Sequence, residues 1–530
     1  MCGLAVILVF RERAGDALFD QTRMALSRNA GQEWRKILNG THPRPTIGAL
    51  LGCAVGLFWL FFGFLYPVWV AAQAASPGWA STIYLPLTLQ QDGLATISRS
   101  VASTPIAVSP DDSTIWVANP DAASVSVIDA GSLAKTHEIP VGQAPWSLAI
   151  APAGDRVYVA NRTGGSLSII DARRRELLQT IALGPELGGI ALNPQGTLAY
   201  LTVTTADQVI VFDTEHLTIT AAIPVAPLPS ALAVTSGIDA DETDERIVVT
   251  HLLALPRPGG GEATDDGRQG LVTVIDSSTG SVSAEIALAP DEHGFPNLLA
   301  GLALVGNRVW IPHVRAAPAL PNGLTTTVFA GVAALDLGEQ REVPSAALHL
   351  NDADTFGSPV NNPVAVVPAP DGKTLYVVAA GSDLVEIVDL ADPAQPRLIG
   401  FLPTGANPRG MALDAGGRRG YVMNYLARSV TVLDLVNLQV DAEIPVTAET
   451  LDAETLRGKI LFHKATDPRL SKGSWISCAS CHPDGGSDGV TWFFPDGPRQ
   501  TPPLWNAGVT LPWHWSAALD EPQDVEETIH

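Results

Sequence analysis

The sequence has few basic residues. Its 530 residues include 32 lysines and arginines against 55 aspartates and glutamates, so the formal net charge is −23 at pH 7. Nucleic acids and anionic membrane surfaces attract clusters of positive charge, which an acidic chain does not offer. We therefore expect no nucleic-acid partner. Two interpretations of the acidic surface remain open, simple solubility and a docking face for a basic protein.

Cysteine is also scarce. The four cysteines are Cys2, Cys53, Cys478 and Cys481, and the first two lie before or within a long apolar run. Outside that run, Cys478 and Cys481 are therefore the only pair. This count excludes a structural disulfide framework, apart from that pair itself.

The first 92 residues have the pattern of a membrane anchor. Residues 1–46 carry seven basic side chains against four acidic ones, and residues 47–75 contain no charged residue and are long enough to cross a bilayer. The positive flank favours a cytoplasmic N-terminus. We expect a basic cytoplasmic segment at 1–46, a transmembrane or signal-anchor helix at 47–75 and a linker at 76–92. The bulk of the chain is then periplasmic or otherwise extracytoplasmic, or exported if the segment is cleaved near residue 74.

The middle of the chain is a repeat. A β-type apolar run that ends in aspartate occurs seven times, at intervals of 42 to 63 residues. Each copy belongs to a unit of four such runs with a turn after the first. Seven four-stranded units predict a seven-bladed β-propeller, since each small sheet must bury both faces against its neighbours. The seven aspartates are Asp129, Asp171, Asp213, Asp276, Asp336, Asp389 and Asp434.

The second run of each unit has a recurring form. It reads "WVAN" from 116, "YVAN" from 158, "YVVA" from 376 and "YVMN" from 421. Together with "SPDDSTIWVAN" and "APDGKTLYVVA", these runs resemble the YVTN family of β-propellers over about residues 95–446. We expect the propeller domain at 93–447. The resemblance implies a fold and says little about activity, because propellers serve many functions.

Two units carry insertions between their second and third runs, after "VVTH" and after "WIPH". Both insertions should emerge on one face of the disc. The chain leaves the last unit from a fourth run, so the C-terminal segment should lie over that same face. His251 and His313 stand at the position occupied elsewhere by asparagine; each is either a polar rim residue or a metal or substrate ligand.

The C-terminal segment contains the motif "CASCH". Thiols three positions apart can add to the two vinyl groups of one haem, and the next residue can ligate its iron. Cys478 and Cys481 are therefore predicted to hold one covalent haem c, with His482 as the proximal ligand. A zinc site would need two further ligands at suitable spacing, and a thioredoxin-like pair would need a βαβ context.

The surrounding residues extend this prediction. "LRGKILFHKATDPRLSKGSWISCASCHPDG" followed by "DGPRQTPPLWNAG" resembles the N-terminal haem domain of bacterial di-haem cytochrome c peroxidases and the related MauG proteins. The resemblance covers about residues 454–530 and implies a small, partial α-helical cytochrome c-like domain at 448–530. It also implies that Arg499 approaches a haem propionate.

The sixth ligand of the iron is not a methionine that follows the motif. The four methionines are Met1, Met24, Met411 and Met423, all before Cys478. The distal position is therefore open or taken by a histidine, of which His514 is the best placed. Di-haem peroxidases carry a second haem domain that residues 483–530 do not contain, so peroxidase activity requires a C-terminal part outside this sequence.

Three functions follow as hypotheses. The first is an extracytoplasmic haem protein in electron transfer, anchored in the membrane by its N-terminal helix, with the propeller as a platform for the haem segment and a redox partner such as a cytochrome. The second is a peroxidase-like or MauG-like oxidoreductase that needs a missing second haem domain. The third is a surface binding propeller whose haem segment is vestigial.

Overall fold

The computed structural model describes residues 101–235, 245–319, 327–351, 359–471, 473–494 and 497–510. All of them belong to one compact unit, Pro86–His530. The predicted segments at 1–46, 47–75 and 76–92 and the candidate ligand His514 lie outside the described residues. Within the described ranges, no helix is long and apolar enough to cross a membrane.

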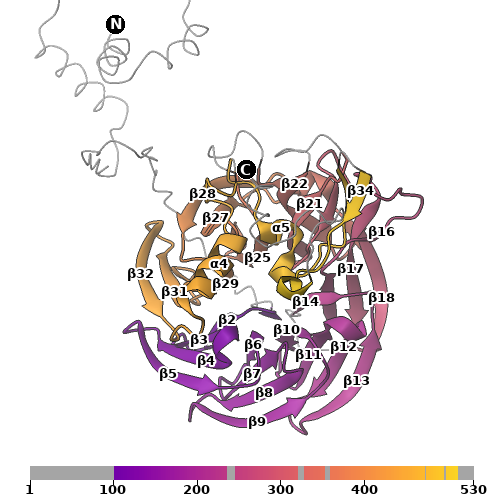
Figure 1. The fold of residues 1–530 in the computed structure, drawn as a ribbon. Helices are drawn as coiled ribbons and strands as arrows, with labels where there is room; N and C mark the ends of the chain where they lie inside the picture. The colour runs from indigo at the N-terminus through magenta and orange to yellow at the C-terminus, as the bar shows by residue number, and fades with distance from the viewer. Residues whose placement is uncertain are drawn as a thin grey trace, which may run out of the picture. The chain divides into compact units, whose positions relative to one another are not determined.

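Seven antiparallel sheets form a closed ring (Figure 1), so the predicted seven-bladed β-propeller is confirmed. Blades 1 to 3 are β2 (Ile106–Val108), β3 (Thr114–Asn119), β4 (Ser124–Asp129) and β5 (Ala134–Pro140); β6 (Pro145–Ile150), β7 (Arg156–Asn161), β8 (Ser166–Asp171) and β9 (Glu176–Ala182); and β10 (Leu187–Leu192), β11 (Leu198–Val203), β12 (Gln208–Asp213) and β13 (Thr218–Pro224). Blade 4 is β14 (Pro229–Val234), β15 (Arg246–His251), β17 (Arg268–Asp276) and β18 (Ser281–Leu288), with the short β16 (Leu255–Pro256) on β17.

Blade 5 is less regular than the others. It comprises β19 (Phe295–Asn297) and β20 (Ala303–Val305) on β21 (Arg308–Ala316), then β22 (Val328–Asp336) with β23 (Arg341–Glu342) and β24 (Leu348–His349). Blades 6 and 7 again have four strands each: β25 (Pro363–Pro368), β26 (Thr374–Ala379), β27 (Leu384–Asp389) and β28 (Arg397–Pro403); and β29 (Pro408–Leu413), β30 (Arg419–Asn424), β31 (Ser429–Asp434) and β32 (Gln439–Pro445).

The repeated aspartates end the third strand of every blade, where each closes the turn into the fourth strand. Asp129 Oδ1, for example, accepts a hydrogen bond from Ser132 N at 2.7 Å, and Asp434 Oδ1 accepts one from Val436 N at 2.9 Å. An aspartate that binds a backbone N–H two or three residues ahead stabilises a tight turn. The sequence repeat is therefore a repeat of turns, and the same bond recurs at the other five aspartates.

The ring closes by side-chain packing between blades 7 and 1. Ile106 and Ile115 of blade 1 pack with Met423 and Val432 of blade 7 in one buried cluster. Blades 1 and 7 each take their four strands from one continuous stretch of chain, so among the described residues no strand is exchanged between them to close the ring. Burial of apolar side chains, at about 25 cal/mol per Å², is then the main stabilisation of this junction.

An additional strand that the repeat did not predict, β1 (Val101–Ala102), lies on the inner edge of blade 4. It pairs antiparallel with β14, Val101 with Val234 and Ala102 with Ala233. The chain continues past blade 2, where Leu148 N donates to Thr104 O at 2.8 Å, and enters blade 1 at Ile106. Residues 101–105 therefore run inside the ring and connect the inner strands of blades 4, 2 and 1.

One face of the ring carries the chain between the second and third strands of each blade, including residues 252–267 of blade 4. We call it the insertion face. The second predicted insertion differs from expectation: much of it is strand, because β21 and β22 are each nine residues long and pair from Arg308–Asp336 to Ala316–Val328. These two strands extend the blade at this face.

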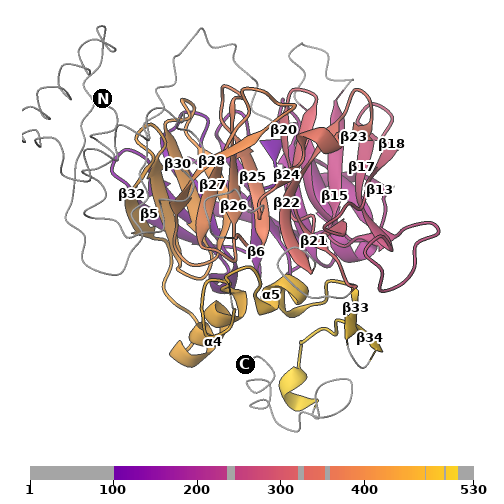
Figure 2. The ribbon, with the colours of Figure 1, turned by 90° about the horizontal axis from the view of Figure 1, so that it is seen from above.

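The C-terminal segment lies against the insertion face, as the strand order predicted (Figure 2). It contains α4 (Ala453–His463), the single-turn helix α5 (Cys478–Cys481) and the hairpin of β33 (Thr491–Phe494) and β34 (Gly497–Gln500). Among the described residues, α4 and α5 are the only α-helices, so the segment is less helical than expected from the family that it resembles.

Candidate functional site

The Cys-x-x-Cys-His motif forms one turn of helix. Cys478 and Cys481 are the first and last residues of α5, so their side chains leave the same side of the helix. Ser477 caps the turn, and its backbone N–H donates to Ser480 Oγ at 3.0 Å. The two thiols are partly exposed and are not joined by a disulfide.

His482 is oriented as a metal-ligating histidine is. Its Nδ1 lies 3.3 Å from the carbonyl oxygen of Gly486, and the backbone of Pro502 is a second hydrogen-bond partner of the ring. Burial lowers the pKa of His482, so the ring is neutral at pH 7. A neutral imidazole held by a backbone carbonyl through Nδ1 is what an axial iron ligand requires.

The environment of the thiols disfavours the thiolate form. Burial raises the pKa of Cys478, and burial together with the nearby Asp488 raises the pKa of Cys481 well above its usual value. Reactive or zinc-binding cysteines instead occupy electropositive surroundings that stabilise the thiolate. The donor set is two thiols followed directly by an imidazole, the order that haem c attachment uses.

Haem c is held by two thioether bonds and one axial nitrogen, and the residues present match that requirement: Cys478, Cys481 and His482. Apolar side chains stand close to the motif. Trp475, Ile476 and Cys481 pack partly against a buried cluster that includes Trp492. Trp505, 67% exposed, lies with its Nε1 3.4 Å from the carbonyl oxygen of Asp484.

The residue two positions after His482 joins the motif to the propeller. Asp484 Oδ1 accepts a hydrogen bond from Nη2 of Arg409, on β29, at 2.7 Å. Asp484 Oδ2 lies 3.5 Å from Nη1 of Arg162, the residue that follows β7. His463 of α4 is also near, with Nε2 3.7 Å from Asp484 Oδ1. Burial opposes ionisation of Asp484, but Arg409, His463 and Arg162 outweigh it and hold the pKa of this carboxyl below its usual range.

The two arginines also share an aromatic contact. The guanidinium carbons of Arg162 and Arg409 lie 4.7 Å and 5.7 Å from the ring centre of Trp146 on β6. A guanidinium over an indole face is stabilised by the ring quadrupole. Trp146 thus fixes the two cations that receive Asp484, and the turn after the motif meets a preformed site on blades 2 and 7.

Helix α4 is fastened by a second ionic cluster. Lys459 Nζ lies 2.8 Å from Oδ2 of Asp121, which stands in the turn after β3. It also donates to the hydroxyl of Tyr425. Arg428, only 8% exposed at its side chain, bonds Asp121 Oδ2 at 2.6 Å and pairs with Glu449 at 3.0 Å. Blades 1 and 7 therefore hold the start of the C-terminal segment through one shared carboxylate.

Two asparagines of the propeller bind the segment directly. Asn361, before β25, donates to Trp475 O at 2.9 Å and to Ser480 Oγ at 2.8 Å, and accepts from Ser477 Oγ at 3.0 Å. Asn297 of β19 donates to Asp488 O at 2.9 Å. Each is almost fully buried, so both sides of α5 are fixed to blades 5 and 6.

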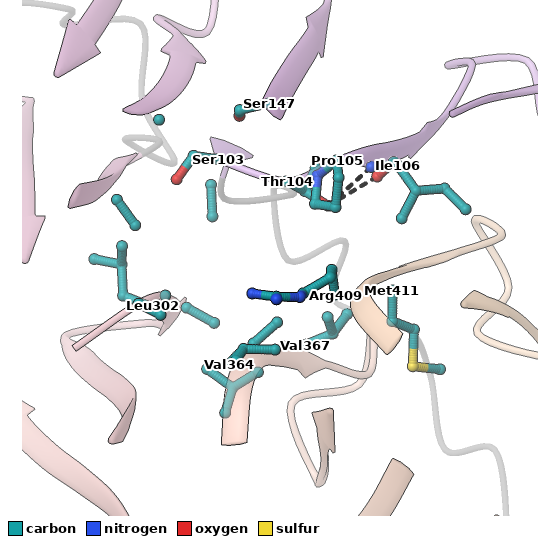
Figure 3. Close-up of a pocket in the computed structure, with 18 of the residues that line it drawn as sticks. Ser103, Thr104, Pro105, Ile106, Ser147, Leu302, Val364, Val367, Arg409 and Met411 are labelled. Atoms are coloured by element: carbon teal, nitrogen blue, oxygen red, sulfur yellow. Dashed lines mark hydrogen bonds between the residues drawn. The ribbon is translucent and has the colours of Figure 1, made fainter. Parts of the chain in front are cut away.

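A cavity of about 780 Å³ occupies the centre of the ring beneath the motif. Figure 3 shows Arg409 reaching into it, between Thr104 and Pro105 on one side and Val364 and Val367 on the other. Its walls are mainly apolar first strands, and its boundary at the insertion face includes His463, Ala479, Pro483 and Asp484. The motif therefore lies over the end of this cavity at the insertion face.

The two histidines singled out by the sequence are both buried. His251 is 0% exposed, with Nδ1 2.9 Å from Pro227 O and Nε2 2.8 Å from Thr273 Oγ1. It replaces the asparagine that elsewhere bonds hydroxyls of the third strand, as Asn161 does with Ser168 at 2.9 Å. The interpretation of His251 as a rim residue was wrong, and both ring nitrogens are occupied by the protein itself.

The remaining predicted residues lie apart from the motif in different ways. Arg499 is on β34, opposite Trp492, and donates to Pro498 O at 2.8 Å. Its contact with a propionate stays a prediction, and so does ligation by His514. Met411 and Met423 are each 3% exposed in the sheet of blade 7.

The sequence did not predict that Arg409, Arg162 and Asp484 belong to the site. One feature could have indicated Arg409: it is an arginine near the start of β29, where the other first strands begin with small or apolar residues.

No protein-family model matches this chain, and no curated protein matches it. Among solved structures, a chain of the Kuenenia stuttgartiensis hydrazine synthase is similar over 63% of this chain and 97% of its own length, at 23% identity and a TM-score of 0.53. A U3-55K structure covers 62% of this chain and 91% of its own, at 16% identity and a TM-score of 0.43. The RRP9 WD40 repeats cover 61% and 87%, at 15% identity and a TM-score of 0.44. The first similarity supports the propeller fold alone.

Proposed function

We propose that this protein is an extracytoplasmic c-type haem protein that acts in electron transfer, and that its propeller is a platform for the haem segment and a redox partner. One observation carries the proposal. Cys478 and Cys481 lie on one helical turn, and His482 follows directly, with its Nδ1 3.3 Å from the Gly486 carbonyl oxygen. Haem c, when bound, supplies a one-electron redox centre.

The residues of this chain would position the group. Cys478 and Cys481 would hold it covalently, and His482 would ligate its iron from the proximal side. Asp484, bonded to Arg409, fixes the turn that follows His482. Asn361 fixes the turn that precedes it, through Ser477 and Ser480. Residues 47–75 would anchor the chain in the membrane, with the haem segment on the outer side, where thioether attachment takes place.

Covalent haem is the direct test. The full chain is produced in a host with cytochrome c maturation, and the denatured protein is examined by haem staining and by the pyridine haemochrome spectrum. We expect one haem per chain, lost in the variant with both Cys478→Ala and Cys481→Ala. The matched control is Cys53→Ala, a cysteine outside the motif, which should keep the haem. Wild-type protein without covalent haem would refute the proposal.

A peroxidase-like or MauG-like oxidoreductase is a second candidate. The observation that favours it is the burial of Met411 and Met423 in the sheet of blade 7, which gives no support to methionine as a sixth ligand and leaves an open position or a histidine such as His514. An open sixth position suits peroxide chemistry. The ferric absorption spectrum separates the two functions: a high-spin spectrum that changes on addition of peroxide supports the enzyme, and a low-spin spectrum unaffected by peroxide supports the electron carrier.

A further inference from the structure

A second group of ligand-type side chains lies on blade 5 and on the loop that enters it. The loop between β18 and β19 supplies Glu292 and His293, and the end of β24 supplies His349. One ligand atom from each of these three residues lies within 4.8 Å of the others. Neighbouring ligands of a tetrahedral zinc ion, bound at about 2.0–2.2 Å, are somewhat closer than this, so small side-chain rotations would bring the three to one ion.

The loop is held in place by a buried arginine. Arg315 of β21, 2% exposed, donates to Gly294 O at 3.0 Å and pairs with Asp291 Oδ2 at 3.0 Å. The backbone N–H of His293 donates to Asp291 Oδ1 at 2.8 Å. Gly294 has a φ of +91°, and a Cβ there would stand 2.0 Å from the carbonyl oxygen of Ala316, so only glycine allows this turn. The loop is preorganised before any ligand binds.

The two imidazoles are also fixed in orientation. The ring of His293 stacks on Phe329 with centroids 3.8 Å apart and planes 3° from parallel. The ring of His349 lies edge-on to that of His293, with centroids 4.9 Å apart. Asp291 Oδ2 is 3.0 Å from Nε2 of His349. A carboxylate that holds the second nitrogen of an imidazole orients the ring and raises its basicity toward a metal.

The charge of the cluster favours a divalent cation. Asp291, Glu292 and Glu342 surround the loop, and Glu342 Oε2 accepts a hydrogen bond from Ala289 N at 2.8 Å. Arg315 is the cation that interacts with all three. With neutral imidazoles the group carries a formal charge of −2, which one divalent ion would balance.

A third imidazole, buried and with one unpartnered nitrogen, lies on the same blade. His313 of β21 is 1% exposed and lies in one cross-strand row with Gly331 and His349. Its Nδ1 is 3.2 Å from Ile311 O, and its Nε2 has no hydrogen-bond partner. Burial, and then the charge of Arg315, lower the pKa of His313 to about 3, so Nε2 keeps its lone pair. A buried acceptor without a donor is costly unless a water or an ion reaches it.

We propose that Glu292, His293 and His349 bind one divalent transition-metal ion, with Asp291 orienting His349. Two imidazoles and a carboxylate are a ligand set that suits Zn²⁺ and related ions, and it is not a set that Ca²⁺ or Mg²⁺ prefers. The ion would fasten the loop at 289–294 to β24 and so stabilise blade 5 on the insertion face. This site is independent of the haem proposal, because it shares no ligand with the Cys-x-x-Cys-His motif.

Zinc alone is the probe. The full chain, with any purification tag removed, is stripped with a chelator, incubated with Zn²⁺, desalted and assayed for zinc per chain by mass spectrometry, which also distinguishes zinc from haem iron. We expect one zinc per chain and a melting temperature that rises with zinc concentration. His349→Ala and Glu292→Gln should each weaken zinc binding at least tenfold. Glu292 is exposed, so its substitution tests the site even if His349→Ala fails to fold.

The matched control is His216→Ala. His216 is an exposed histidine whose Nδ1 is 3.0 Å from Asp213 Oδ2 in a turn of blade 3. This variant should bind zinc as the wild type does. The proposal is overturned if the wild-type chain takes up no zinc, or if Glu292→Gln and His349→Ala bind it with unchanged affinity. Equal loss of zinc in His216→Ala would also overturn it, because the ion would then not be held on blade 5.

Discussion

Asp484, two residues after the motif histidine, accepts a 2.7 Å charged hydrogen bond from Arg409 on the first strand of blade 7. The two residues are 75 positions apart in the chain, and they meet at the mouth of the central cavity. The side chains of Arg409 and Asp484 are 16% and 34% exposed, so the pair is partly shielded from water. The C-terminal segment is therefore docked on the propeller by a charge that follows the Cys-x-x-Cys-His motif directly in the chain.

Arg409→Ala should loosen that docking. Removing the guanidinium leaves Asp484 with weaker partners, and we expect the opening free energy of the segment to fall by about 2 kcal/mol, between the values for exposed and buried pairs. Hydrogen exchange of residues 453–510 measures it. The control is Arg397→Ala. It removes a more exposed ion pair of similar length, the 2.8 Å contact between Arg397 and Asp389. If both variants exchange alike, the Asp484 pair does not hold the segment.

Acid should release the segment before it unfolds the propeller. The pKa values of Asp121 and Asp484 are lowered: burial opposes this, and their cationic neighbours outweigh it. Groups with a lowered folded pKa stabilise the fold above their unfolded value, near 3.8, and that contribution is lost as the pH falls through the folded value. Exchange of residues 453–510 should therefore increase below about pH 4. Asp484→Asn should weaken docking at pH 7 and flatten this dependence; an unchanged slope would contradict the assignment.

Gly381→Ala should disturb α5 from a distance. A Cβ at Gly381 would lie 2.1 Å from Asn361 Oδ1, so Asn361 would have to move and lose its bonds to Ser480 Oγ and Trp475 O. We expect a loss of about 1–3 kcal/mol and faster exchange at residues 473–482. Gly458→Ala is the matched control, because a Cβ there meets nothing within 4 Å. It lies in α4 and should be neutral or stabilise the helix by up to about 1 kcal/mol. Normal protection of α5 in Gly381→Ala would show that Asn361 does not position it.

Glu386→Gln should remove a pH dependence of stability. Glu386 of β27 is 4% exposed, and burial raises its pKa to about 8. The folded state thus keeps a proton that the unfolded state loses near pH 4.5, so stability should fall as the pH rises from about 4.5 to 8. The amide stays neutral, and the variant should exceed the wild type at pH 8 by roughly 2–5 kcal/mol. Urea unfolding at pH 5 and pH 8 measures the difference. Glu285→Gln, on exposed β18, is the control, and parallel profiles for all three proteins would contradict the prediction.

Much of the fold is predictable because it is periodic. Seven aspartates mark seven turns, and the chain returns to the same face after every second strand, which places the C-terminal segment on the insertion face. The extension of β21 and β22 was not predicted, because "VRAAPALPNG" contains proline and glycine that normally end a strand. His251 and His313 were expected to be either rim residues or ligands, and strand pairing and blade packing bury both.

The contacts of the candidate site were less predictable. The motif residues Cys478, Cys481 and His482 could be named from spacing alone, since the chemistry of attachment fixes that spacing. The pair of Asp484 with Arg409 could not be named, because a single contact between a repeat and a tail has no period. The cluster of His293 and His349 likewise joins a loop to a strand more than fifty residues later, and no local pattern indicates that they meet.

The strand inside the ring has a consequence for how the protein is made. Ser103 bonds Leu232, 129 positions later, and β1 therefore has no partner until blade 4 has been synthesised. Contacts of such sequence separation form slowly, because a long loop must first be closed. Blades 1 to 3 are therefore synthesised while β1 still has no paired strand. Synthesis of blade 4 is then the step that first allows β1 to pair with β14 and so connects the start of the propeller to blade 4 inside the ring.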